Sequence, residues 1–207
     1  MRINTNVNAM IATNQMSKNT ALSGASMEKL STGLRITKAG DDAAGLAVSE
    51  KMRAQIRGME QAERNVQDGI SMVQTAEGAL EEAGNIAQRM RELGVQAGND
   101  TLSDEDRSKI KGELTQLKDE MTKIADETKF NGKALLNTLG TFKIQAGANK
   151  ETRDVVTADL SSIAKGISIS TLSTASNAQS LVESIDTALS SINEARSNLG
   201  AMQNRLE

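Results

Sequence analysis

The chain has 207 residues, a formal net charge of −3, no histidine, cysteine or proline, and only two aromatic residues. It therefore lacks the commonest general base, the usual zinc ligands and the usual lining of a ligand pocket, and we expect no enzyme and no catalytic, cofactor-binding or metal-binding residues. Its charges are interspersed and no apolar run approaches the roughly 20 residues that cross a bilayer, so nucleic-acid and membrane partners are disfavoured.

The first predicted element is a weakly amphipathic helix. Apolar residues recur at roughly helical spacing from residue 3 to residue 34, but Asn14 and Ser17 interrupt the stripe. Such thin amphipathicity does not stabilise an isolated helix. We therefore expect residues 4–35 to be helical only against a partner, and a further C-terminal helix that this chain lacks is the obvious candidate.

Heptad spacing predicts one very long helix over residues 43–97, capped by Asp41 or Asp42. At ~1.5 Å per residue it is roughly 80 Å long, which implies a rod. Two rows of residues step by seven, one bulky and one small, as in a seam where helices approach closely. The bulky row is Met52, Met59, Val66, Val73, Leu80 and Ala87, and the small row is Ala62, Gly69, Ala76, Ala83 and Met90. We interpret the stripe as helix packing and not as a cofactor or lipid groove.

A second helix is predicted from Ser103 to a turn at residues 131–132. Ser103 is a favourable N-cap, and the acidic residues 104–106 complement the positive end of the helix dipole. We interpret this run as a helix start, because a calcium loop needs a glycine and alternating oxygen ligands. The apolar seam consists of Ile110, Leu114, Leu117, Met121 and Ile124.

Between these helical regions and the end of the chain the pattern changes. Apolar and polar residues alternate around Phe142, and Val155 and Val156 follow a polar segment. This pattern predicts two short strands in a hairpin. Residues 161–176 are rich in serine and threonine, which indicates a connector.

The last predicted helix has an apolar seam that steps by four and three residues. Its members are Leu181, Ile185, Ala188, Ile192, Ala195, Leu199, Met202 and Leu206. No helix-stop signal appears at Glu207, so the pattern looks cut in mid-helix.

Several long motifs in this sequence resemble those of bacterial flagellins. They are residues 1–6, residues 30–36 (LSTGLRI) followed by residues 41–47 (DDAAGLA), residues 129–132 (KFNG) and residues 195–207 (ARSNLGAMQNRLE). The resemblance covers most of the chain. It implies a mainly α fold: an elongated rod of long antiparallel coiled-coil-like helices with a small β-hairpin region.

The resemblance also implies a division of the chain. Residues 1–42 correspond to the N-terminal filament-core helix and spacer, residues 43–177 to the N-terminal helices and hairpin of the rod, and residues 178–207 to the truncated C-terminal helix of the rod. The variable outer domain of the family is nearly absent here. The family's final helix, which pairs with the N-terminal one, is missing, so we expect this chain to be impaired in forming filaments.

The function that the resemblance implies is structural. Flagellins are secreted subunits that polymerise into the extracellular flagellar filament, a helical propeller for swimming. The implied partners are other flagellin subunits, the flagellar export apparatus, and hook-associated and cap proteins; residues 27–47 resemble the export region. The alternative within this class is a hook–filament junction adaptor, which shares terminal motifs with flagellins.

One further motif resembles the flagellin segment that the flagellin-sensing Toll-like receptor of animals binds. The resemblance implies a receptor-binding role for Gln88, Arg89 and Leu93, with Glu113 on the next helix. An exposed arginine beside an exposed leucine suits an interface anchor, because arginine is enriched in binding hot spots. The alternative interpretation is that these residues serve filament packing.

Overall fold

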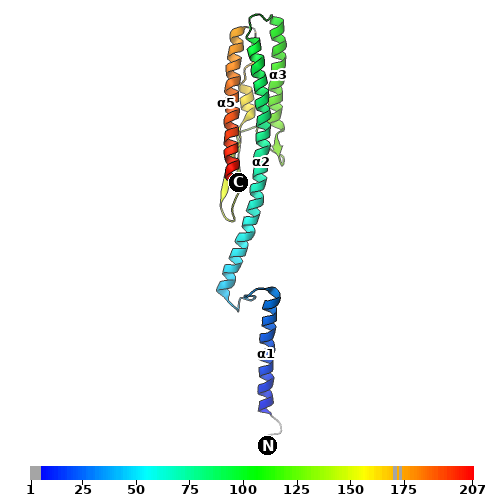
Figure 1. Ribbon diagram of the computed structural model, residues 1–207, viewed down its shortest axis with the longest axis vertical. Coiled ribbons are helices and arrows are strands. Elements are labelled where there is room, and N and C mark those ends of the chain that lie inside the picture. The colour runs from blue at the N-terminus through cyan, green and yellow to red at the C-terminus, as the bar shows by residue number, and fades with distance from the viewer. Residues whose placement is uncertain (1–5, 170–171, 173) are drawn as a thin grey trace. The chain divides into compact units, whose positions relative to one another are not determined.

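The computed structural model describes residues 6–169, 172 and 174–207, and its elements are mostly helices (Figure 1). The helices are α1 (Val7–Thr32), α2 (Ala43–Ala97), α3 (Asp104–Glu127), α4 (Leu160–Gly166) and α5 (Ala175–Leu206). The strands are β1 (Lys129–Phe130), β2 (Lys133–Ala134), β3 (Thr141–Gln145) and β4 (Thr152–Val156). The predicted mainly α fold with a small hairpin is therefore confirmed. The chain divides into two compact units, residues 1–57 and 58–207.

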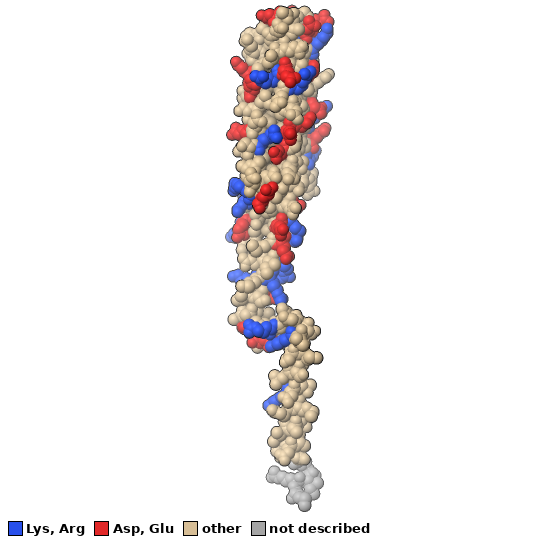
Figure 2. Space-filling view, in the orientation of Figure 1, with Lys and Arg blue, Asp and Glu red and all other residues tan. Residues whose placement is uncertain are grey.

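The second unit is a bundle in which α3 and α5 run antiparallel to α2 (Figure 1). α4 contacts both α3 and α5, and the hairpin β3–β4 contacts α5 through β4. On the face of the bundle that Figure 2 shows, lysine and arginine side chains are mixed with aspartate and glutamate. The charge pattern therefore does not mark this face as a polyanion-binding surface.

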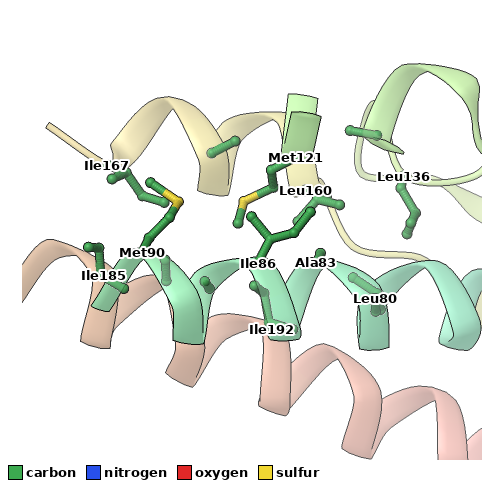
Figure 3. Packing of buried hydrophobic residues seen from close by; sticks show 14 of the residues in the cluster. Leu80, Ala83, Ile86, Met90, Met121, Leu136, Leu160, Ile167, Ile185 and Ile192 are labelled. Carbon is green, nitrogen blue, oxygen red and sulfur yellow. The ribbon is translucent and has the colours of Figure 1, made fainter. Parts of the chain in front are cut away.

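Aliphatic side chains from four helices form the core of the bundle (Figure 3). Leu80, Ile86 and Met90 of α2 meet Met121 of α3 and the residues Leu160, Ile185 and Ile192 of α4 and α5. Each of these side chains is at least nine-tenths buried. Removing so much apolar surface from water is the main force that holds the bundle together.

Glycines on α2 let its neighbours approach closely. A Cβ added to Gly94 would lie 3.0 Å from Val182 of α5, and one added to Gly69 would overlap Ile144 of β3. One turn before Gly69 on α2, the Asn65 side chain donates a hydrogen bond to the Gln145 carbonyl at 3.4 Å. Gly69, a member of the predicted small row, thus lies where the hairpin packs, and Gly94, which is outside that row, lies where α5 packs.

The bulky heptad row is buried over only part of its length. Val73 and Leu80 are buried and Val66 is half-buried, but Met52 and Met59 are 59% and 60% exposed. Helix packing, predicted for these two methionines, is not provided within the described chain and stays a prediction for contacts with other molecules. Since Asp186 of α5 pairs with Arg91, the antiparallel α5 reaches only about residue 71 of α2.

Two elements were not expected from the sequence. α4 lies inside the predicted connector, where Asp159 caps it by accepting a hydrogen bond from the Ser162 N–H at 2.9 Å. The predicted turn at residues 131–132 also joins a short antiparallel ladder that pairs Phe130 with Lys133. Both elements are too short to show a clear period in the sequence.

In the first unit, α1 is helical although none of its residues is buried. Residues 4 and 5 of the predicted helix lie outside the described residues. The Asn6 side chain accepts a hydrogen bond from the Ala9 N–H at 3.2 Å, and Gly33 ends the helix at a φ of 66°. These caps satisfy terminal backbone groups, which supports a helix without a packed face.

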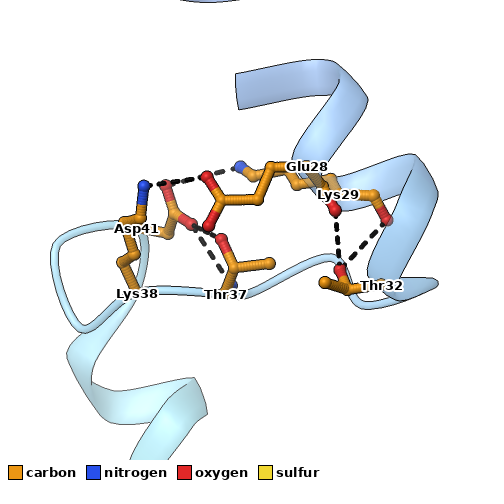
Figure 4. A network of polar contacts seen from close by, with 6 residues as sticks. All are labelled: Glu28, Lys29, Thr32, Thr37, Lys38 and Asp41. Atoms are coloured by element: carbon orange, nitrogen blue, oxygen red, sulfur yellow. Dashed lines mark hydrogen bonds and ion pairs between the residues drawn. The ribbon is translucent and has the colours of Figure 1, made fainter. Parts of the chain in front are cut away.

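A polar network ties the end of α1 to the following loop (Figure 4). Lys38 contacts Glu28 at 2.8 Å, and Lys29 contacts Asp41 at 3.4 Å. The hydrogen bond from the Thr37 N–H lowers the pKa of the Asp41 carboxyl, and the bond to Glu28 raises the pKa of Lys38. Two ion pairs therefore link the last turn of α1 to the loop that follows it.

The partial burial of the bulky row leads to a stability prediction. We expect Leu80→Ala to lower the free energy of unfolding by about 2–5 kcal/mol, because it leaves a cavity in the core. Met52→Ala, on the same row, is expected to change it by less than about 0.5 kcal/mol. Chemical denaturation monitored by circular dichroism measures both. Equal losses in the two variants would contradict the assignment of the core.

Candidate functional site

An exposed charged cluster joins α2 to α3. Arg89 donates from Nη1 to Glu92 at 3.0 Å and from Nη2 to Glu113 at 3.1 Å. All three side chains are about half exposed or more. The hydrogen bonds to Glu92 and Glu113 raise the pKa of the Arg89 guanidinium. We call Arg89, Glu92 and Glu113 the Arg89 cluster; it presents a fixed cation between two carboxylates.

The other two residues of the predicted receptor motif lie in different environments. Gln88 is exposed beside Arg89, but Leu93 is only 3% exposed. The expectation of an exposed leucine next to the arginine is therefore wrong. Leu93 follows the buried Met90 by three residues and precedes the buried Ala97 by four, so it shares their core face.

A second ion pair lies on the other side of α2. Arg91 donates from Nε to Asp186 of α5 at 2.6 Å. Arg89 and Arg91 are two positions apart, which at about 100° per residue directs them to roughly opposite sides of the helix. The hydrogen bond to Asp186 raises the pKa of Arg91. α2 is thus linked to α3 and to α5 at the same level of the bundle.

One buried charged residue was missed by the analysis of the sequence. Arg107 of α3 is 8% exposed, and its guanidinium donates to the carbonyls of Ala97 at 3.3 Å and Asn99 at 3.1 Å. Asp100 lies 3.4 Å from the same group. A cation at the C-terminal end of α2 donates to the Ala97 carbonyl and interacts favourably with the helix dipole, while the Asn99 carbonyl also accepts from the Leu102 N–H at 3.3 Å. The Arg107 side chain therefore stabilises the turn that connects α2 to α3.

The predicted packing residues of α5 meet α2 along a continuous seam. Leu181, Ile185, Ile192 and Leu199 are all buried. A Cβ added to Gly84 of α2 would contact Ile192 at 3.9 Å. The residues of α5 that face α2 therefore recur at alternating steps of four and three, which is the spacing of a coiled coil.

The described residues contain no group of three histidine, cysteine, aspartate or glutamate residues that could hold a metal ion. Among the same residues, no helix is long and apolar enough to cross a membrane.

Exposed apolar residues gather on α1 and on the first part of α2. α1 has only three charged residues, Lys18, Glu28 and Lys29. The large apolar side chains exposed on these two segments are Val7, Met10, Ile11, Met16, Leu22, Met27, Leu30, Val48, Met52, Ile56 and Met59. A monomeric protein rarely exposes so many together, and such surfaces mark interaction sites.

The amino-acid sequence of this chain is similar to those of known proteins over its whole length. The profile of the bacterial flagellin N-terminal helical region matches residues 3–141. A flagellin of Halalkalibacterium halodurans is 51% identical over the whole of this chain and 78% of its own length. A flagellin of Bacillus subtilis is 43% identical over the whole chain and 80% of its own length.

Solved structures with the same fold agree with these matches. The crystal structure of Bacillus cereus flagellin has a TM-score of 0.64 and 35% identity, and covers 70% of this chain and 85% of its own. A putative flagellar hook-associated protein from Vibrio parahaemolyticus has a TM-score of 0.65, with coverages of 82% and 91%. Its identity of 15% supports a shared fold alone.

The position of Arg107 leads to a second stability prediction. We expect Arg107→Met to lower the free energy of unfolding by about 1–3 kcal/mol, because the carbonyls at the end of α2 lose their donor. Lys109→Met is the matched control, since Lys109 lies on the same helix in exposed ion pairs with Glu105 and Asp106. Such pairs contribute little, so no measurable change is expected there. Identical unfolding midpoints for both variants would show that Arg107 does not support the turn.

Proposed function

Since this chain belongs to the bacterial flagellin family, we propose that it serves swimming motility as part of a rotating filament. A flagellin is a structural subunit of the extracellular flagellar filament, formed by polymerisation with other flagellin subunits, and is not an enzyme. The propeller needs stiffness along its length and no chemistry from its subunits. Long helices with buried aliphatic seams supply that stiffness.

The observation that carries this proposal is the set of exposed apolar residues on α1 and the first part of α2. In a polymer these side chains become buried between copies, which stabilises the assembly through removal of apolar surface from water. A contact between two different faces of identical subunits that does not close into a ring produces an open helical filament. We assign residues 1–42 to the filament core, and residues 43–177 and 178–207 to the surrounding rod.

Secretion and further partners extend this proposal. We propose that the flagellar export apparatus delivers the chain, with residues 27–47 taking part. We also propose that hook-associated and cap proteins are partners of the filament. A hook–filament junction adaptor is the alternative role. It has weaker support, because the similarity to a hook-associated protein rests on 15% identity, whereas the two flagellins described above are 43% and 51% identical.

We also propose that the Arg89 cluster, with Gln88, is a contact surface for the flagellin-sensing Toll-like receptor. Arg89 is held in place by carboxylates on two helices, so little conformational entropy is lost when a partner binds. Leu93 is buried and therefore supports the cluster from the core, without touching a partner.

Filament formation is tested by changing one exposed apolar residue of α2. We expect Ile56→Lys, introduced into the gene of the source bacterium, to shorten or abolish filaments and to reduce spreading in soft agar, because it places a charge in a buried contact. Gln55→Lys is the matched control, with the same charge on the neighbouring exposed residue. Electron microscopy measures filament length. Filaments of normal length in the Ile56→Lys strain would contradict the proposal.

Receptor binding is tested separately on purified protein. We expect Arg89→Ala to reduce receptor signalling in reporter cells at least tenfold in half-effective concentration, which corresponds to about 1.4 kcal/mol of binding free energy. Arg91→Ala removes a similar side chain from the other side of α2 and is expected to retain signalling. Unchanged activity of the Arg89 variant would reject this role, whatever the outcome for filament formation.

A further inference from the structure

The turn between β1 and β2 contains the only Asn–Gly pair of the sequence, Asn131–Gly132. Both residues are exposed. Asn131 is the one residue other than glycine with a positive φ, 49°, among the residues that the structure describes, and Gly132 has a φ of 77°. We propose that Asn131 is a site of spontaneous deamidation, at which the folded protein converts asparagine to aspartate and isoaspartate.

The reaction needs only these two residues and water. The backbone nitrogen of Gly132 attacks Cγ of Asn131 and loses its proton to water, while the Cγ–Nδ2 bond breaks and Nδ2 leaves as ammonia. The product is a five-membered succinimide ring. Water then opens the ring at either carbonyl, which gives aspartate or isoaspartate. No oxidant, metal or enzyme takes part.

The absence of a side chain on Gly132 removes the main obstacle to this attack. Asn131 and Gly132 are both exposed, and a Cβ built at Gly132 would have no atom within 4 Å, so the space beside the Gly132 Cα is open. The ladder pairs Phe130 with Lys133, which leaves both turn residues outside it. The attacking nitrogen and the reacting amide are thus both open to solvent.

The turn must open from its left-handed conformation before the ring can close, and the structure makes this opening easy. The ladder that closes the turn has only two residue pairs. Two short strands are marginally stable on their own, and exposed segments open far more often than the core. A left-handed conformation is also less favourable for asparagine than for glycine.

The isoaspartate product changes the turn. It inserts the former Cβ into the main chain and leaves a carboxylate as the side chain. Beyond the turn the chain is anchored, because Leu135 and Leu136 are buried and the Leu135 N–H donates to the Thr128 carbonyl at 3.1 Å. We therefore expect the extra main-chain atom to disturb the pairing of Phe130 with Lys133.

Asn149 provides a control within the same chain. It is also exposed in a loop, between β3 and β4, but is followed by Lys150, whose side chain hinders the attack. Its loop is held by its own contacts, since the Asn149 N–H donates to Glu151 at 3.0 Å and its carbonyl accepts from Gln145 at 2.7 Å. We therefore expect much slower deamidation at Asn149.

The test is to incubate the folded protein in mildly alkaline buffer and to follow tryptic peptides 130–133 and 144–150 by mass spectrometry. The expected result is a mass increase of one dalton in peptide 130–133 that accumulates at least several-fold faster than in peptide 144–150. A protein isoaspartate methyltransferase with labelled S-adenosylmethionine identifies the isoaspartate fraction. The variant Asn131→Gly, in which glycine accepts the positive φ, is expected to abolish this label.

Two results would overturn the proposal. One is an equal or slower rate at residue 131 than at residue 149 in the folded protein. The other is modification of residue 131 in urea-unfolded protein with none in the folded protein, which would show that the turn protects the site. Circular dichroism of the Asn131→Gly variant establishes that it is folded, so that loss of the label reports the chemistry at residue 131.

Discussion

The close approach of long helices through small side chains is the constraint on which this structure depends. With only two aromatic residues, the chain cannot fill wide spaces between its elements. It brings the elements together instead, with Gly69 and Gly94 of α2 placed against Ile144 and Val182. Close contact along a whole helix gives many small dispersion gains that add up to a stable core.

The same constraint explains why the bulky row of α2 serves two purposes. At Val73 and Leu80 the row is buried by the chain itself, and at Met52 and Met59 it is exposed. The pattern of residues does not change between these positions. Only the cover from α5 does, so a single seam supplies the internal core of the subunit and, under the proposed function, a surface for assembly in the filament.

Much of the fold is predictable from the sequence, because α2, α3 and α5 carry long periodic patterns and a clear cap such as Ser103. Short elements such as α4 are not predicted from the sequence, because seven residues show no reliable period. The burial of Leu93 follows from its helical phase relative to Met90, which a match to a local motif does not report. The role of Arg107 depends on a turn geometry that brings α3 back to the end of α2, and no sequence period encodes such a contact.

We propose that one seam continues from the core of the subunit into the contact between subunits. Hydroxyl-radical footprinting of methionine and leucine side chains, compared between free protein and native filaments, tests this continuity most directly. Labelling of Met52 and Met59 is expected to fall strongly on polymerisation, while Leu80 stays protected in both states. Equal labelling of the two methionines in the free protein and in the filament would contradict it.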